Sequence, residues 1–367
     1  MPTHFLIKQS QIMTTNILGR ALSPADLAAS GDFLALTLSH PEHLTPFSCV
    51  LTDGTVAEIW DTGVICLTPV QHGKTDVVIS SGVHGNETAP IELCAALCID
   101  VLTGKLQLKQ RTLFLFGNPP AINAGKRELV DNLNRLFSGH HSKADGEPGW
   151  ERQRAAKLEQ YVLRFYQAGG EGRERLLYDL HTAIRGSQFE KFAVYPFLHG
   201  KPWNKTQLRF LHACGVETFL LMQTPASTFS YFGAQSCGAH AFTLELGKVR
   251  PFGENDMSRF AACDLMLRAL VTDRLPELAE FDESKFNFFV VSRAVNKQTE
   301  QFELCFARNI ENFSQFPLGT VLARDGAIEY RVDEPGEAII FPNADVAIGQ
   351  RAMLLVKPVS IAGQLCD

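Results

Sequence analysis

The chain has 367 residues, more than the roughly 250–300 at which a single hydrophobic core stops growing, so we expect one large domain and a smaller one. Hydrophobic residues make up 45% and charged residues 20% of the composition, and no stretch approaches the roughly 18 apolar residues of a membrane span, so we expect no membrane partner. With 34 basic and 40 acidic residues, a net charge of −6 and no basic block, we expect no nucleic-acid partner.

The start of the chain is weakly patterned, and residues 1–32 are predicted to form an N-terminal extension. Within it, Ser23 is expected to cap a short helix whose first residue is Pro24. The first nine residues lack the apolar core and cleavage site of a secretory signal. Nine cysteines are scattered along the chain, and Cys94 and Cys98 share a helix face, where core packing is favoured over a structural zinc pair. These features predict a cytoplasmic protein.

Residues 33–75 contain short apolar runs, at 34–38, 56–60 and 64–67, which predict strands joined by turns. From residue 76 onward strands and helices alternate, as expected for a three-layer α/β/α domain in which helices cover both faces of a mixed, mostly parallel sheet. In such sheets ligands bind beyond the carboxyl ends of the strands. The expected strands are 76–80, 112–116, 176–180, 192–195, 218–222 and 242–246, and the expected helices are 90–102, 148–168 and 258–271.

Helical spacing stops after residue 283. Short strand-like runs separated by Gly and Pro follow it, and they predict a smaller all-β module over residues 284–367. The α/β domain would then span residues 33–283. The expected strands of the module are 286–294, 302–307, 321–322, 328–330, 338–340 and 353–356.

Two short motifs place metal-binding side chains at strand ends. His84 and Glu87 follow the strand at 76–80, and His181 follows the strand at 176–180. A His, a Glu and a second His form a ligand set typical of a catalytic zinc, which keeps one further position for water. His-x-x-Glu alone is a weak pattern, but its strand-end position and the second strand-end His favour a metal site. Asp179 lies on the same strand face as His181 and is expected to orient its imidazole.

Glu245 is a single acid within the apolar strand 242–246. A carboxylate buried there would be costly unless it had a function or a partner. We interpret it as the general base of a hydrolase, with a buried structural salt bridge as the alternative. Arg127 and the pair Asn134 and Arg135 lie on loops after the strand at 112–116, where they could bind carboxylates and an oxyanion. These arginines would supply the local positive charge that an anionic substrate needs.

In order and spacing, five motifs resemble the succinylglutamate desuccinylase and aspartoacylase family of the zinc carboxypeptidase-like superfamily. The stretches 132–139 and 245–256 resemble the desuccinylase branch in particular. The resemblance covers roughly residues 33–360, including the β-rich C-terminal module. The motifs are His84-Gly-Asn-Glu87, Asn118-Pro with Arg127, Asn134-Arg135, Asp179-Leu-His181-Thr and Thr243-Leu-Glu245-Leu-Gly247.

The resemblance implies one Zn²⁺ per subunit, held by His84, Glu87 and His181. It also implies that Glu245 activates water and later protonates the leaving amine. The substrate would be a small anionic molecule, N-succinyl-L-glutamate. Its hydrolysis to succinate and L-glutamate is the last step of the arginine succinyltransferase route of arginine breakdown.

The same resemblance assigns Arg127 to the oxyanion and Asn134 with Arg135 to a substrate carboxylate. Asn132 stands where aspartoacylases tend to have an Asp, which favours the desuccinylase branch. Arg185, Lys191 and Lys248 are further candidates for binding anions. A peptidase, another N-acyl-amino-acid deacylase such as an aspartoacylase, and a catalytically inactive binding homologue remain the alternatives. The sequence leaves the oligomeric state open, a homo-oligomer included.

Overall fold

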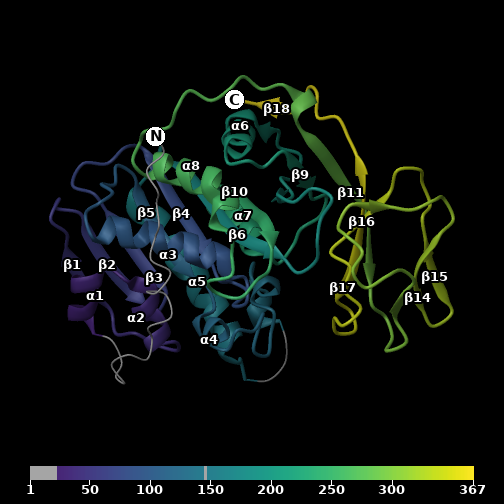
Figure 1. Ribbon diagram of the computed structural model, residues 1–367, viewed down its shortest axis with the longest axis horizontal. Helices are drawn as coiled ribbons and strands as arrows, with labels where there is room; N and C mark the ends of the chain where they lie inside the picture. The colour runs from purple at the N-terminus through teal and green to yellow at the C-terminus, as the bar shows by residue number, and fades with distance from the viewer. Residues whose placement is uncertain (1–22, 144–146) are drawn as a thin grey trace.

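The computed structural model describes residues 23–143 and 147–367, and it has an α/β part joined to a C-terminal β part (Figure 1). In the described residues no helix is both long and apolar enough to cross a membrane. The helices are α1 Pro24–Ser30, α2 Phe33–Ser39, α3 Thr88–Leu102, α4 Pro119–Asn123, α5 Trp150–Gly169, α6 Lys205–Ala213, α7 Phe229–Cys237 and α8 Ala261–Val271.

One mixed sheet of 13 strands runs through both parts, in the order β1-β2-β3-β5-β4-β6-β10-β7-β9-β11-β17-β16-β13. Its centre, β5-β4-β6-β10, is parallel, as predicted for an α/β domain. The strands of the α/β part are β1 Phe47–Val50, β2 Val56–Asp61, β3 Val64–Thr68, β4 Thr75–Ser81, β5 Arg111–Phe116, β6 Glu174–Ala183, β7 Phe192–Tyr195, β8 Trp203–Asn204, β9 Thr218–Leu221 and β10 His240–Lys248.

Hydrophobic cores lie on both faces of the central sheet, because successive side chains of a strand point to opposite faces. In β6, for example, Leu176 and Tyr178 pack into the core beneath α1, α2, α3, α6 and α8, whereas Leu177 packs into the core beneath α5 and α7. The predicted three-layer α/β/α arrangement is therefore confirmed. The nine cysteines are free thiols, and Cys94 and Cys98 are buried in α3, as predicted.

The predicted strand at 34–38 is wrong, because these residues form helix α2. Asp32 caps the helix by accepting a hydrogen bond from the Ala35 amide at 2.8 Å. Leu and Ala are good helix formers, and a capped first turn favours a helix over a strand. The buried side chains of Phe33 and Leu34 then anchor α2 against the core. The helix start predicted at Ser23 and Pro24 is confirmed by a capping box with Asp26.

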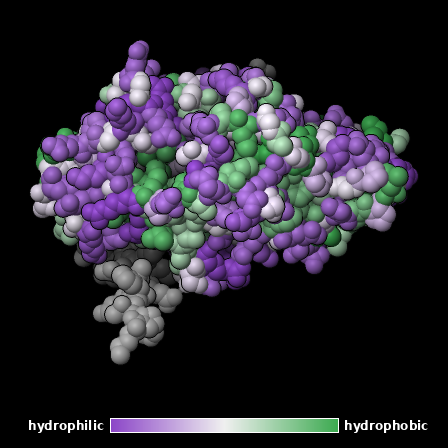
Figure 2. Space-filling model, turned by 90° about the horizontal axis from the view of Figure 1, so that it is seen from above, coloured by the Kyte–Doolittle hydropathy of each residue, from purple (hydrophilic) through white to green (hydrophobic). Residues whose placement is uncertain are grey.

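The C-terminal β part continues the central sheet. Strand β11 (Asn287–Asn296) pairs in parallel with β9 and antiparallel with β17 (Arg351–Pro358), so the position of the C-terminal strands is set by main-chain hydrogen bonds. On the face shown in Figure 2 hydrophilic residues predominate between smaller hydrophobic groups. The remaining strands are β12 Glu303–Leu304, β13 Ser314–Gln315, β14 Val321–Asp325, β15 Ile328–Arg331, β16 Ala338–Ile340 and β18 Leu365–Cys366.

Candidate metal centre and substrate cavity

His84 and Glu87 lie on the loop that joins strand β4 to helix α3. The backbone of this loop passes close to helix α4, and a Cβ on Gly85 would lie 2.2 Å from the carbonyl carbon of Ala121. Only glycine fits there. The Gly85 amide also donates a hydrogen bond to the Arg127 carbonyl at 3.1 Å. The close packing holds the loop so that both side chains are buried, with exposed fractions of 3% for His84 and 2% for Glu87.

His181 lies inside strand β6, which extends to Ala183 and so continues beyond the predicted end of this strand. Alternation along β6 places Asp179 and His181 on the same face of the sheet. Asp179 Oδ2 lies 2.8 Å from His181 Nε2. This contact leaves Nδ1 of His181 directed toward the loop that carries His84 and Glu87.

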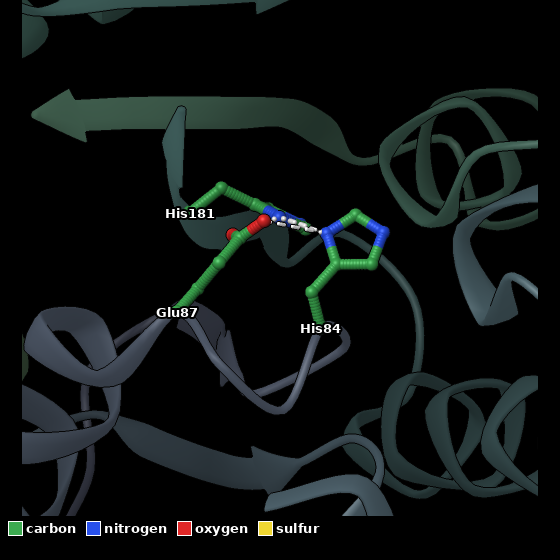
Figure 3. Close-up of side chains that lie close together, drawn as sticks. All are labelled: His84, Glu87 and His181. Atoms are coloured by element: carbon green, nitrogen blue, oxygen red, sulfur yellow. Dashed lines mark hydrogen bonds and ion pairs between the residues drawn. The ribbon is translucent and has the colours of Figure 1, made fainter. Parts of the chain in front are cut away.

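The three predicted ligands converge, and the Glu87 carboxylate points between the two imidazoles (Figure 3). His84 Nδ1 lies 2.8 Å from Glu87 Oε1, and His181 Nδ1 lies 2.8 Å from Glu87 Oε2. One ligand atom from each residue lies within 4.8 Å of the others. Two imidazole nitrogens and a carboxylate oxygen make a donor set suited to a transition metal such as zinc.

The second nitrogen of each imidazole has a partner of its own. His84 Nε2 lies 3.1 Å from Asn132 Oδ1, and His181 Nε2 lies 2.8 Å from Asp179 Oδ2. Such partners fix the tautomer of a metal-ligating histidine. Burial and the charge of Arg127 lower the pKa of His84 to about 4, which favours the neutral imidazole that binds metal. Burial opposes protonation of His181 too, but Asp179 and Glu87 outweigh it and raise its pKa.

Glu245 lies beside this cluster because strand β10 is next to β6 in the sheet. The register pairs Glu245 with His181 and Thr243 with Asp179. Glu245 is 8% exposed, and its Oε2 atom has no hydrogen-bond partner in the described part of the chain. Burial raises the pKa of this carboxyl to about 7, with the charge of Glu87 adding to the shift and His181 and Arg127 opposing it. A carboxyl with such a pKa can accept and return a proton near neutral pH.

Arg127 lies directly against the ligand cluster. Its Nη1 atom donates a hydrogen bond to Glu87 Oε1 at 2.6 Å, so its contact in this structure is with a candidate ligand. Its side chain, 28% exposed, also lines the cavity that begins at the cluster. The guanidinium therefore lies against a candidate metal ligand, and its role at an oxyanion remains a prediction.

Asn134 and Arg135 lie in a 3₁₀ turn at residues 133–135, and both line the same cavity. The Asn134 side-chain oxygen accepts a hydrogen bond from the Phe229 amide at 2.9 Å, so it also ties the turn to helix α7. Arg135 Nη1 donates to the Asn134 carbonyl at 2.7 Å. Binding of a substrate carboxylate by this pair remains a prediction.

One carboxylate holds the loop that carries these groups. Glu151, in the first turn of α5 and 2% exposed, accepts hydrogen bonds from three consecutive amides, those of Leu129, Val130 and Asp131, at 2.7–2.9 Å. It also accepts one from the Asn118 side chain at 2.9 Å. Sequence reasoning missed this residue because a Glu in the first turn of a helix is ordinary.

The cavity has a volume of about 1160 Å³, and both parts of the chain line it. Of the further candidates for anion binding, Arg185 and Lys248 line the cavity, whereas Lys191 does not and its Nζ donates to the Arg259 carbonyl. Arg351 from the C-terminal part also lines it. No local pattern in the sequence singles out Arg351, since only the sheet pairing brings it to the cavity.

Two family models match the chain over most of its length. The succinylglutamate desuccinylase/aspartoacylase catalytic domain matches residues 73–271, and the AstE/AspA barrel-sandwich hybrid domain matches residues 284–359. A protein of Shewanella amazonensis, named succinylglutamate desuccinylase, is 52% identical over 332 residues, which are 89% of this chain and 95% of that protein.

Solved structures of proteins with the same name have the same fold. The Chromobacterium violaceum structure is 41% identical with a TM-score of 0.80, and the alignment covers 91% of this chain and 99% of that one. The Vibrio cholerae structure is 33% identical with a TM-score of 0.79, covering 89% and 94% respectively. The agreement extends over both the α/β part and the C-terminal β part.

Proposed function

Because the chain belongs to the succinylglutamate desuccinylase/aspartoacylase family, we propose that it is a cytoplasmic, zinc-dependent amidohydrolase that converts N-succinyl-L-glutamate into succinate and L-glutamate. The observation that carries this proposal is the buried Glu245 carboxylate, which has an unpartnered oxygen beside a His-Glu-His cluster at the end of an arginine-lined cavity. Metal-assisted hydrolysis of an amide uses this combination of a proton acceptor and three metal ligands.

His84, Glu87 and His181 are the residues that would hold the zinc ion. Their donor atoms are of the right kind and number for a hydrolytic site, and Asn132 and Asp179 support the two imidazoles from behind. When bound, zinc supplies Lewis acidity, which lowers the pKa of water and polarises a carbonyl group.

The remaining chemistry belongs to side chains of this chain. Glu245 takes a proton from the attacking water while the water oxygen bonds to the amide carbon. Glu245 then gives that proton to the amide nitrogen as the carbon–nitrogen bond breaks. A pKa near 7 suits both transfers. Arg127 donates hydrogen bonds to the oxygen on which negative charge develops. Asn134 and Arg135 bind a carboxylate and hold the amide in place.

The test is a comparison of substrates with the purified, zinc-loaded protein. We expect rapid hydrolysis of N-succinylglutamate and slow hydrolysis of N-acetylaspartate and of a C-terminal peptide. Faster hydrolysis of N-acetylaspartate would make the protein an aspartoacylase, and release of C-terminal residues would make it a peptidase. No hydrolysis of any of these would refute an enzymatic role of this kind.

A variant tests the role of Glu245. Glu245→Gln should keep its zinc, measured by elemental analysis, and lose roughly 10²- to 10⁴-fold in kcat, the range typical of general base catalysis. Glu92→Gln is the matched control, because Glu92 is also a buried glutamate, 6% exposed on α3, but does not line the cavity. It should keep the wild-type rate. A zinc-loaded Glu245→Gln protein with normal kcat would refute the assignment of the base.

A further inference from the structure

Two arginines from distant parts of the chain face the same cavity. Arg135 comes from the 3₁₀ turn of the α/β part, and Arg351 is the first residue of β17 in the C-terminal part. Both are half-buried and line the cavity that begins at His84, Glu87 and Glu245. The C-terminal part therefore contributes a guanidinium group, that of Arg351, to the cavity wall.

Neither of these arginines forms an ion pair with an acidic side chain in the part of the chain that the structure describes. Across residues 23–143 and 147–367, no ion pair joins a carboxylate to Arg135 or Arg351. In the part of the chain that the structure describes, the Arg135 side chain donates one hydrogen bond, from Nη1 to the Asn134 carbonyl. The guanidinium carbon of Arg351 lies 5.8 Å from the centre of the Phe341 ring. Of the five other cations that line the cavity, Arg127 is paired with Glu87 at 2.6 Å and Lys297 with Glu300 at 3.3 Å, whereas Arg185, Lys248 and Arg308 form no ion pair among the described residues.

The two unpaired charges also act on each other. Burial, together with the positive charges of Arg351 and Arg127, lowers the pKa of Arg135 to about 9, although the charges of Glu128 and Glu245 act in the opposite direction. Burial lowers the pKa of Arg351 to about 10. Two partly desolvated cations close together are costly, and an anion bound between them would remove that cost. A guanidinium group matches a carboxylate with two parallel hydrogen bonds.

The position of Arg351 does not depend on a flexible loop. Its backbone pairs with Asn296 of β11, and β11 pairs in parallel with β9 of the central sheet. The loop after β6 is tied to the same part of the chain, since the Gln188 amide donates to the Asn312 carbonyl at 3.1 Å and the Asn312 amide donates to the Gly186 carbonyl at 2.9 Å. These hydrogen bonds fix the backbone that carries Arg351 relative to the cavity, which lowers the cost of binding a ligand there.

Resting on the proposed function, we propose that Arg351 is a specificity-determining residue that binds, together with Arg135, one of the carboxylates of an N-acyl amino acid carrying several carboxylates. The C-terminal β part thereby completes the substrate site. An acyl amino acid that lacks this carboxylate would leave both guanidinium groups unpaired in the cavity, and it would be rejected for that reason.

The experiment compares Arg351→Gln with the wild type on N-succinylglutamate and on three analogues that each lack one carboxylate. N-acetylglutamate lacks the acyl carboxylate, N-succinylnorvaline the side-chain carboxylate, and N-succinyl-4-aminobutyrate the α-carboxylate. We expect Arg351→Gln to raise KM for N-succinylglutamate by roughly 10- to 100-fold, the loss typical of a hydrogen-bonded charge pair. We expect kcat to change little, because Arg351 contacts the substrate away from the reacting amide.

The loss should disappear for at least one analogue, which identifies the carboxylate that Arg351 binds. Arg351→Lys should restore part of the affinity, because it returns the charge without the planar group. Arg324→Gln is the matched control, because Arg324 lies in β14 of the same part and does not line the cavity. An unchanged KM in Arg351→Gln, or an equal loss on all four substrates, would overturn the proposal.

Binding without turnover separates this proposal from the proposed function. Calorimetry with N-succinylglutamate compares Glu245→Gln with Glu245→Gln/Arg351→Gln, both checked for folding by circular dichroism. Roughly 10- to 100-fold weaker binding by the second protein supports the role of Arg351 even if the wild type hydrolyses a different acyl amino acid. Equal affinities would overturn it even if the wild type hydrolyses N-succinylglutamate.

Discussion

Buried charges lie at both ends of the central strands, and they differ in whether they are paired. Near the start of β4, Asp76 is fully buried and lies 2.8 Å from both Arg111 and Arg173. Toward the other end of the strands, Glu245 has an oxygen without a partner among the described residues, and neither Arg135 nor Arg351 has a carboxylate partner there. The paired group has its charge compensated within the fold, whereas the unpaired groups remain available to a ligand.

The comparison predicts opposite consequences for stability when a charge is removed. Removing one partner from the compensated cluster leaves a buried charge alone, which is destabilising. Removing a charge that never had a partner relieves a cost and should stabilise the protein, while function suffers. The predictions at Asp76 and Glu245 test this difference, and a third concerns Glu151, a buried carboxylate satisfied by amides.

The largest effect is expected at Asp76. Asp76→Asn keeps the shape of the side chain but leaves Arg111, which is 5% exposed, without its counter-charge. We expect the free energy of unfolding to fall by about 3–5 kcal/mol, measured by urea denaturation. The control is Glu58→Gln, which removes a more exposed ion pair with Arg164 at 3.9 Å and should change stability by less than about 1 kcal/mol. Equal effects of the two substitutions would contradict the comparison.

A smaller effect of the opposite sign is expected at Glu245 in the metal-free protein. Its pKa is raised from 4.5 to about 7 in the folded chain, so the folded state binds the proton more tightly than the unfolded one. The wild type therefore loses stability as the pH rises from about 4.5 to about 7, and Glu245→Gln avoids this loss. From pH 5 to pH 8 the stability advantage of the variant should grow by on the order of 2 kcal/mol.

Urea denaturation at the two pH values measures this growth, because titrations common to both proteins cancel in the difference. If the advantage of Glu245→Gln were the same at pH 5 and pH 8, the Glu245 carboxyl would not carry the raised pKa. The interpretation of Glu245 as a buried charge without compensation in the fold would then be wrong.

Much of the candidate metal centre could be predicted from the sequence because it depends on local rules. The candidate ligands follow or end strands, and alternation in β6 places Asp179 and His181 on one face. Glu245 meets His181 only because β10 lies next to β6 in the sheet, in a register that pairs these two residues. This pairing depends on the order of the strands in the sheet. The strand predicted at 34–38 was wrong because a short run of Leu and Ala fits either the helical or the strand period.

The outer part of the site could not be predicted because it depends on contacts between distant segments. Arg351 reaches the cavity only through the pairing of β17 with β11 and of β11 with β9. Glu151 contacts the loop at residues 129–131 through three backbone amides, and a backbone amide has the same chemistry in every residue except proline. A sequence carries no residue-specific signal for such a contact.

The smallest effect is expected at Glu151, a buried carboxylate satisfied by hydrogen bonds from amides instead of by a cation. Glu151→Gln would put an NH₂ group in place of one carboxylate oxygen, so that it would face either the Leu129 amide or the amides of Val130 and Asp131, which themselves donate. The loop carrying Arg127 and Arg135 should therefore shift. Displacement of substrate-positioning groups by about 1 Å can cost on the order of 100-fold, and we expect kcat/KM to fall by roughly 10- to 100-fold, or about 1.4–2.7 kcal/mol, with zinc content unchanged. Glu159→Gln, on the same helix but outside the cavity lining, is the matched control. A normal kcat/KM in Glu151→Gln would show that the loop keeps its position without the Glu151 carboxylate. This buried carboxylate near the site would then contribute to stability alone, as Asp76 does at the other end of the sheet.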